Sequence, residues 1–285
     1  MNPTCLARHS GLWCIEPRWF NTTWAAIRAG NIRMLDVAEA EQASVPATLT
    51  EDGIGFISIN GPMMKGASKF GNVDTTQARR AVRAMAGDTN VKAIVLQIDS
   101  PGGSLAGLDD LANDVSLAAK TKPVYSQIED LGASAAYWLA SQTEAVYANP
   151  TAQIGSIGVY TVVEDSSKAA DMEGIKVHVV SSGGMKGALA DGTEITTEQL
   201  DYLQKSVDRA NGFFLDAVKR GRGMSDSKVA KVNTGEMWYA EEAVSLGLID
   251  GVQRMDETVG MIRKELKARA SADRAKRQVA VAKAR

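Results

Sequence analysis

From Gly53 onward, short runs of strand-forming residues alternate with longer segments of helical periodicity. The strand-like runs are GIGFISI, VKAIVLQID and PVYSQI, and the helical segments between them cover residues 75–86 and 108–120. Strands that alternate with helices imply a largely parallel sheet covered by helices. The run AIVLQI is almost entirely apolar, as expected for a strand that is buried on both faces. The alternation therefore predicts an α/β fold with a parallel sheet.

The same patterns divide the chain into three parts. Further strands are predicted at AVYA, IGVYTVV and IKVHVV, and a long helix at 196–221, which Gly221 and Gly223 are placed to end. Residues 1–48 are expected to form an N-terminal arm, which holds three of the five tryptophans. The α/β domain is expected over residues 49–255, and residues 256–285 are expected to form a basic helical tail.

The composition excludes several classes of protein. The chain has 285 residues, 45% hydrophobic residues and a formal net charge of −2, so nothing in it calls for nucleic acid or an anionic membrane. Cys5 and Cys14 are the only cysteines, which gives neither a disulfide framework nor a cluster of metal ligands. No stretch approaches a secretory apolar segment or the roughly 20 apolar residues of a spanning helix. A cytoplasmic globular protein is expected.

The segment GASAAYW places one hydroxyl, that of Ser134, among alanines just after a predicted strand. At the start of a helix, backbone N–H groups favour developing negative charge, so Ser134 can serve as a nucleophile. Taken alone, the position favours an N-cap or a close-packed small residue instead. The GxSxG pattern is incomplete because Ala136 stands where the second glycine is needed, which disfavours the α/β-hydrolase fold.

A serine nucleophile needs a base. His9 lies in the arm, and His178 lies in the predicted strand IKVHVV, where it is more simply a residue on the strand face. Neither histidine is well placed to act as the base, which disfavours a Ser-His-Asp triad. A lysine can replace histidine when burial lowers its pKa. Lys186 in SSGGMKGALADG and Lys65 in NGPMMKGAS are both candidates, and both also fit an exposed loop lysine.

The segment DSPGGSLAG follows the run AIVLQI and carries adjacent glycines. Such glycines bring bare N–H groups close to a ligand and can build an oxyanion hole, although a simple strand-to-helix turn has the same pattern. Neither GxGxxG nor a P-loop pattern occurs here, so a nucleotide site has little support. No metal and no cofactor are expected.

Four segments in this order, IDSPGG, GASAAYW, QIGSIGVY and GGMKG, resemble the signal peptide peptidase A family of serine peptidases. The resemblance covers roughly residues 53–253 and implies a Clp protease/crotonase-like fold of repeated strand-strand-helix units. It implies a Ser-Lys dyad with Ser134 as the nucleophile and Lys186 as the base. The further roles it implies are lysine orientation by Ser156, an oxyanion hole from the N–H groups of Gly103 and Ala135, and substrate contacts at Gly102, Ser104 and Leu105.

The resemblance has one departure at the serine. Members of the family commonly have glycines after it, where this chain has Ala135 and Ala136. The N–H of Ala135 is retained as a donor if its φ is negative, whereas a positive φ would put activity in doubt.

The segment CIEPRWF resembles the N-terminal arm of the soluble phage head-maturation proteases of the lambda type. The lack of an apolar spanning segment fits the same soluble proteases. This resemblance implies a homo-oligomeric ring that cleaves scaffold proteins, portal proteins or itself during capsid maturation. One alternative is a soluble signal-peptide-peptidase-like peptidase of the cytoplasm, and another is a non-catalytic capsid assembly adaptor on the same fold. A crotonase-like acyl-CoA enzyme is disfavoured, because no pair of glutamates accompanies the glycine-containing segments. The basic tail fits a solvated helix, a segment that docks on capsid or scaffold proteins, or a weak phosphate-binding segment.

Overall fold

The computed structural model describes residues 11–30, 45–66 and 72–283. The strands are β1 (Trp13–Ile15), β2 (Ala47–Leu49), β3 (Ile54–Asn60), β4 (Met63–Met64), β5 (Val73–Asp74), β6 (Ala93–Ser100), β7 (Gly102–Ser104), β8 (Val124–Ala133), β9 (Ala145–Ala148), β10 (Gln153–Gly155), β11 (Met237–Tyr239) and β12 (Gly251–Val252). The helices are α1 (Pro17–Arg28), α3 (Thr75–Gly87), α4 (Leu108–Ala119), α5 (Ala135–Ala140), α6 (Ser167–Met172), α7 (Thr197–Arg222), α8 (Asp226–Val232), α9 (Ala240–Ser245) and α10 (Met255–Lys283).

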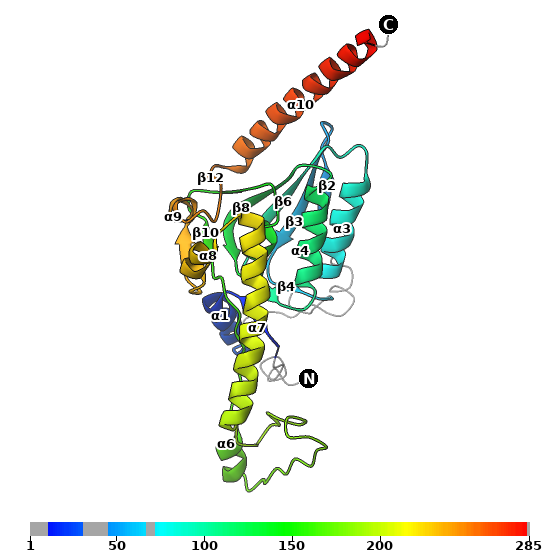
Figure 1. The fold of residues 1–285 in the computed structure, drawn as a ribbon. Coiled ribbons are helices and arrows are strands. Elements are labelled where there is room, and N and C mark those ends of the chain that lie inside the picture. The colour runs from blue at the N-terminus through cyan, green and yellow to red at the C-terminus, as the bar shows by residue number, and fades with distance from the viewer. Residues whose placement is uncertain (1–10, 31–44, 67–71, 284–285) are drawn as a thin grey trace.

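Two sheets form the centre of the molecule (Figure 1). The larger sheet has the order β11-β10-β8-β6-β3-β2, and β9 and β12 extend from β8. Its inner neighbours β10, β8, β6 and β3 run parallel, while β2 and β11 pair antiparallel at the two ends. The smaller sheet has the order β1-β7-β4-β5. The predicted α/β fold with a largely parallel sheet is confirmed.

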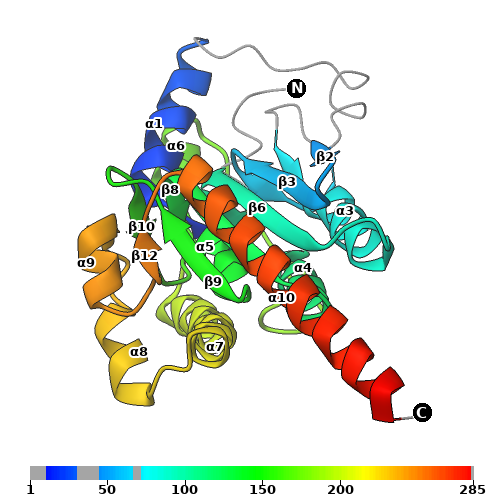
Figure 2. The ribbon, with the colours of Figure 1, turned by 90° about the horizontal axis from the view of Figure 1, so that it is seen from above.

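Strand β6 is buried on both faces, as its apolar run predicts. Ile94 and Leu96 belong to the core under α3 and α4, whereas Val95 packs with Tyr125 and Ile262 on the opposite face. The first half of α10 supplies that second cover, and Figure 2 shows this helix lying across the sheet. Residues beyond 255 thus contact the α/β core, while the boundaries near 48 and 255 stay predictions.

Two of the predicted strands are wrong. The segment 157–163 forms only a single bridge, between Tyr160 and Trp13, and residues 175–180 have no regular structure. The latter segment is exposed, with Val180 98% accessible, and His178 is therefore not a strand-face residue. Alternating valines favour an extended chain, but a strand also needs a neighbouring strand to pair with. His9 and Cys5 lie outside the described residues.

The long helix α7 begins and ends with recognisable caps. Thr196 and Gln199 form a reciprocal capping box, and Gly223 ends the helix in the left-handed region with φ 60°. Gly221 does not end the helix as predicted, because it lies within the last turn against the loop after α5. A Cβ on Gly221 would lie 1.9 Å from the carbonyl oxygen of Ser141, so only glycine fits there.

None of the helices in the described part of the chain combines enough length with enough apolar character to cross a bilayer.

Candidate active site

Ser134 lies at the junction between β8 and α5, and its backbone is strained. Its φ is 54° and its ψ is −117°, a region that non-glycine residues rarely occupy. Two hydrogen bonds hold it there: its N–H donates to the carbonyl oxygen of Gly155 at 2.7 Å, and its own carbonyl oxygen accepts from the N–H of Trp138 at 2.9 Å. Strain of this kind persists only where the surrounding structure enforces it, and it clusters at functional sites.

The hydroxyl of Ser134 makes no hydrogen bond to the described residues that would give it a structural role. The residue is 1% exposed, and its Oγ is buried with no hydrogen-bond partner among the residues that the structure describes. Ser134 does occupy the N-cap position of α5, but its side chain accepts no capping hydrogen bond from the first turn of the helix. A buried hydroxyl without a partner costs free energy, so its presence here calls for an explanation.

Ser156 follows the neighbouring strand at the same edge of the sheet. Strands β8 and β10 run parallel with Ala133 opposite Gly155, so Ser134 and Ser156 are the next residues after a paired position. Adjacent strands lie about 4.8 Å apart, which places the two serines side by side. Ser156 also has a positive φ, 49°, and its N–H donates to the carbonyl oxygen of Glu236 at 2.7 Å.

The two glycines of SPGG form strand β7 rather than a turn. Gly102 has φ 93°, and a Cβ on it would lie 2.8 Å from both Ala133 O and Ala135 N. A Cβ on Gly103 would lie 1.8 Å from the carbonyl oxygen of Met63. Both positions thus need glycine because backbone packs against backbone, and β7 lies against the residues that flank Ser134. The predicted strand-to-helix turn occurs later, at Gly107, which precedes α4 with φ 80°.

Ala135 has the backbone geometry that an oxyanion donor requires. Among the described non-glycine residues, the positive φ values belong to Ser134, Ser156 and Leu189, so the φ of Ala135 is negative. Ala135 is also the first residue of α5, where an N–H has no partner within the helix. An alanine at this position is therefore free of the strain that a positive φ would impose.

Helix α5 is fixed firmly under the site, because all six of its residues are buried. The hydroxyl of Tyr137 donates to the carbonyl oxygen of Leu248 at 2.8 Å, and complete burial raises the pKa of Tyr137 well above its usual value. The ring of Trp138 stacks on that of Phe214 with 5.0 Å between centroids. The crowded aromatic residues after Ser134 thus serve packing, and they hold the N-terminal end of α5 in place.

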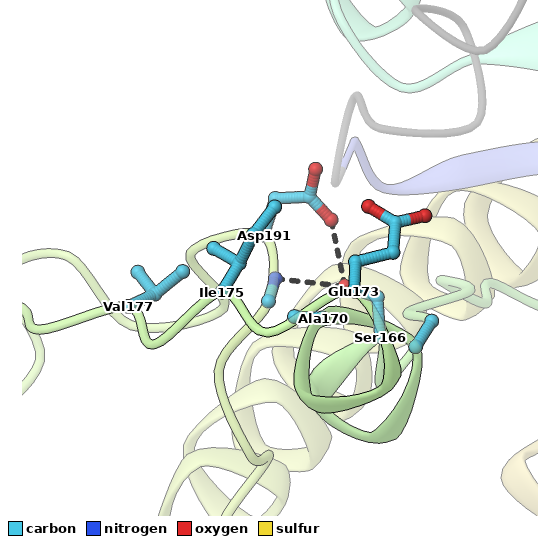
Figure 3. A pocket seen from close by; sticks show the side chains of 8 residues that line it. Ser166, Ala170, Glu173, Ile175, Val177 and Asp191 are labelled. Carbon is cyan, nitrogen blue, oxygen red and sulfur yellow. Dashed lines mark hydrogen bonds between the residues drawn. The ribbon is translucent and has the colours of Figure 1, made fainter.

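The structure does not join either candidate lysine to Ser134 Oγ. Lys186 is exposed on the long loop after α6, which projects away from the sheets (Figure 1). The base of this loop is held at Ser166, whose Oγ donates to Asp191 Oδ1 at 2.6 Å and accepts from the N–H of Gly192 at 2.8 Å (Figure 3). Lys65 is exposed too, and its side-chain stem lies beside Gly107.

Other residues at the site were not singled out from the sequence. Strand β1 pairs antiparallel with β7, and Tyr160 exchanges backbone hydrogen bonds with Trp13. Within the described ranges, the Tyr160 hydroxyl has no hydrogen-bond partner. Its burial, followed by the charges of Glu16 and Cys14, raises its pKa to about 12. The three consecutive apolar residues of WCI, shortly before a proline that starts a helix, were a signal for this strand.

Acidic residues gather where the β6–β8 ladder changes register. Burial, followed by the charges of Asp130 and Glu129, raises the pKa of Asp99 above its usual value.

No group of three or more His, Cys, Asp or Glu within the described ranges is arranged to hold a metal ion.

Comparison with known proteins points to one family. The model described as peptidase family S49 matches residues 116–269. Protease 4 of Salmonella typhi is 30% identical over 210 residues, which are 72% of this chain and 33% of that protein. The chloroplastic serine protease SPPA of Arabidopsis thaliana is 29% identical over 213 residues, 74% of this chain and 31% of that protein. The chain thus spans about one third of the length of these curated relatives.

The chain is also similar to a phage protease and to an enzyme of known structure. Capsid assembly protease C of Escherichia phage lambda is 28% identical over 186 residues, 65% of this chain and 42% of that protein. Among solved structures, an enoyl-CoA hydratase/isomerase family member is similar with a TM-score of 0.48 and 14% identity, covering 79% of this chain and 77% of that one.

Proposed function

The chain belongs to peptidase family S49, a family of serine peptidases, and from this premise we propose that it is an endopeptidase whose nucleophile is Ser134. The observation that carries the proposal is the Ser134 hydroxyl, which is buried and unpartnered on a backbone held at φ 54°. Strain and an unsatisfied polar group both cost free energy, so a merely structural serine would have neither.

In the proposed reaction, Ser134 Oγ attacks the carbonyl carbon of a peptide bond and its proton passes to a neutral lysine. That lysine returns the proton to the leaving amine, the C–N bond breaks, and water then hydrolyses the acyl-enzyme. The N–H groups of Gly103 and Ala135 donate to the oxyanion, and each such donor is worth roughly 10² to 10³ in rate. Gly102, Ser104 and Leu105 hold the substrate as an added strand.

Lys186 is the proposed base, and we assign it to a second copy of the chain within a homo-oligomeric ring. Its loop is exposed and separate from the sheets of its own chain (Figure 1). The same loop exposes a run of apolar side chains, Ile175, Val177, Val179 and Val180. Exposed apolar residues in such a cluster are typical of protein interfaces. Docking of this loop on a neighbour would cover them and bring Lys186 to the neighbour's Ser134, with Ser156 orienting the amine.

The nucleophile is tested with a fluorophosphonate probe and an unstructured protein substrate. The expected result is labelling of wild type at one residue, identified by mass spectrometry as Ser134, and loss of both labelling and cleavage in Ser134→Ala. Ser116→Ala, on the outer side of α4, is the matched control and is expected to behave as wild type. Cleavage that persists in Ser134→Ala contradicts the proposal.

The proposed substrates are phage capsid proteins, meaning scaffold, portal or the protease chain itself. The similarity to capsid assembly protease C supports this assignment, and the similarity to Protease 4 supports the alternative, a cytoplasmic signal-peptide-peptidase-like enzyme. Co-expression with neighbouring capsid genes and mass spectrometry of the products distinguishes them. Cleavage of a capsid protein that requires Ser134 supports the first. Capsid assembly that is unaffected by Ser134→Ala but lost on deletion of the gene identifies a non-catalytic adaptor.

A further inference from the structure

Strand β1 lies in a slot between two segments that both come from the candidate active site. On one edge, Trp13 donates its N–H to Tyr160 O at 2.9 Å and accepts from the N–H of Tyr160 at 3.1 Å. On the other edge, β1 pairs antiparallel with β7, with Cys14 opposite Gly103. A three-residue strand bonded on both edges has the hydrogen-bonding pattern of an extended peptide bound by strand addition.

The register of this pairing places a particular carbonyl group at the site. Glu16 N–H donates to Pro101 O at 2.7 Å, and Leu105 N–H donates to Leu12 O at 3.2 Å. Because hydrogen-bonded pairs alternate along antiparallel strands, the pair between these two, Cys14 with Gly103, is also hydrogen-bonded. The N–H of Gly103, the proposed oxyanion donor, is therefore directed at the carbonyl oxygen of Cys14.

The second proposed donor lies close to the same oxygen. A Cβ on Gly102 would lie 2.2 Å from Cys14 O and 2.8 Å from Ala135 N, so these two atoms lie on the same side of Gly102. Cys14 O is thus placed near both donors that would hold the oxyanion. Burial agrees with this position, since Cys14 is 0% and Ser134 1% exposed.

We propose that β1 occupies the peptide-binding cleft of its own chain, with the Cys14 carbonyl in the place of the scissile carbonyl, and that substrates bind only after β1 leaves. The inference rests on the proposed function. It also predicts how a substrate binds: extended, antiparallel to β7, with a small side chain in the place of Cys14. Among the described residues, Ser134 Oγ has no hydrogen-bond partner in this arrangement, so no base of the same chain is in place to cleave β1.

The neighbouring helix explains how β1 is retained. Helix α1 begins at Pro17, and the carboxylate of Glu16 accepts a hydrogen bond from the N–H of Trp19 at 2.6 Å. The ring of Trp13 contacts that of Phe20 with 5.5 Å between centroids. Strand and helix thus form one unit, which lies beside the end of the sheet near β10 (Figure 2).

The test uses two chemical readouts in the full chain. Cys5→Ser leaves Cys14 as the sole thiol, and its alkylation by iodoacetamide reports whether β1 is outside the cleft. Labelling of Ser134 by a fluorophosphonate reports whether the cleft is open. Trp13→Pro removes the N–H that binds Tyr160, whereas Trp13→Ala loses the same ring and keeps that N–H. Trp24→Ala, in α1, is the control outside β1.

Trp13→Pro is expected to raise the rates of both reactions together, roughly five- to tenfold, as loss of one hydrogen bond from a closed state does. Trp13→Ala is expected to lie between wild type and Trp13→Pro, and Trp24→Ala to match wild type. If Trp13→Pro fails to fold, Thr161→Val, which removes the 3.1 Å bond to Gly11 O, gives a smaller rise in the same direction.

Two outcomes overturn the inference. One is a freed Cys14 in Trp13→Pro while Ser134 is labelled at the wild-type rate, and the other is rapid Ser134 labelling in a wild type whose Cys14 stays protected. In both, Ser134 is labelled and the proposed function stands. If Cys14 is freed and Ser134 is labelled in no variant, the proposed function itself fails.

Discussion

The N–H of Ser134 donates to the carbonyl oxygen of Gly155 at 2.7 Å, and this bond joins the end of β8 to the end of β10. The φ of Ser134 is 54°, and the bond holds the backbone in this conformation. The bond thereby also fixes the direction in which the side chain leaves the backbone. The same bond therefore aligns the two strand ends and maintains the backbone strain at Ser134. The free-energy cost of that strain is measurable.

Ser134→Gly is expected to stabilise the protein by about 1 kcal/mol while abolishing peptidase activity, because glycine accepts a positive φ without a Cβ penalty. Ser134→Ala keeps the Cβ and so should recover only the cost of the unpartnered hydroxyl. Urea denaturation of the three proteins gives the comparison. A Ser134→Gly variant less stable than Ser134→Ala would show that the backbone is not strained there.

Lys186→Ala is expected to abolish cleavage, and Lys65→Ala is expected to leave it intact. If Lys186 acts on a neighbouring chain, mixed rings of Ser134→Ala and Lys186→Ala protomers should regain activity, because some sites then combine an intact serine with an intact lysine. Turnover of a peptide substrate in titrated mixtures measures this. Loss of activity in Lys65→Ala alone would transfer the base to that residue. Mixtures that stay inactive would place the base within the chain.

Asp250→Asn is expected to lower the free energy of unfolding by about 2 kcal/mol, since it leaves a buried guanidinium without its charged partner. Arg222 donates to both carboxylate oxygens of Asp250, at 2.8 and 3.0 Å, and its side chain is 8% exposed. Glu144→Gln, in an exposed pair with Arg269, is the matched control and should cost little.

The Asp250 contribution should also depend on pH. Burial raises the pKa of Asp250, but hydrogen bonds from Arg222 and from the N–H of Val146 outweigh it, so the pKa lies below the ordinary 3.8. A lowered native pKa stabilises the fold above the unfolded-state value, about 3.9, and the stabilisation is lost as pH falls through the native value. The difference between wild type and Asp250→Asn should be constant from neutral pH to about 5 and should shrink below 3.8. A difference that grows on acidification contradicts this assignment.

Gly102→Ala is expected to cost about 3 kcal/mol or more, through both a positive φ and a steric clash. Its φ is 93°, and the new methyl group would meet three backbone atoms. Gly87→Ala is the matched control, since nothing lies within 4 Å of the position of its Cβ. Thermal denaturation checks the pair. Equal melting temperatures would show that β7 does not pack against the residues around Ser134.

Local sequence patterns predicted the elements whose partners are near in sequence. The apolar run of β6 and the helices α3 and α4 lie within a residue or two of their predicted positions, because each buries a face that its own periodicity defines. The predicted strand IKVHVV failed because pairing depends on a neighbour that the pattern does not contain.

The candidate site was predicted unevenly for the same reason. Ser134 and the glycines of SPGG follow strands that the sequence patterns predicted, whereas Ser156 follows β10, which they did not predict. Its place in the site was implied only by the resemblance to the family. The pairing of β1 with β7 joins residues about 90 positions apart, so nothing local in the sequence specifies it. The base remains a prediction because Lys186 does not contact Ser134 Oγ within one chain.

The placement of β1 between β7 and Tyr160 has a consequence for solubility. An unpaired strand edge is a template on which other chains aggregate. A cleft that binds extended peptides must offer such edges, and this one offers two facing each other. The three residues of β1 occupy both edges, so neither edge is open along β1. This pairing protects the protein from aggregating with unfolded chains until a substrate replaces β1.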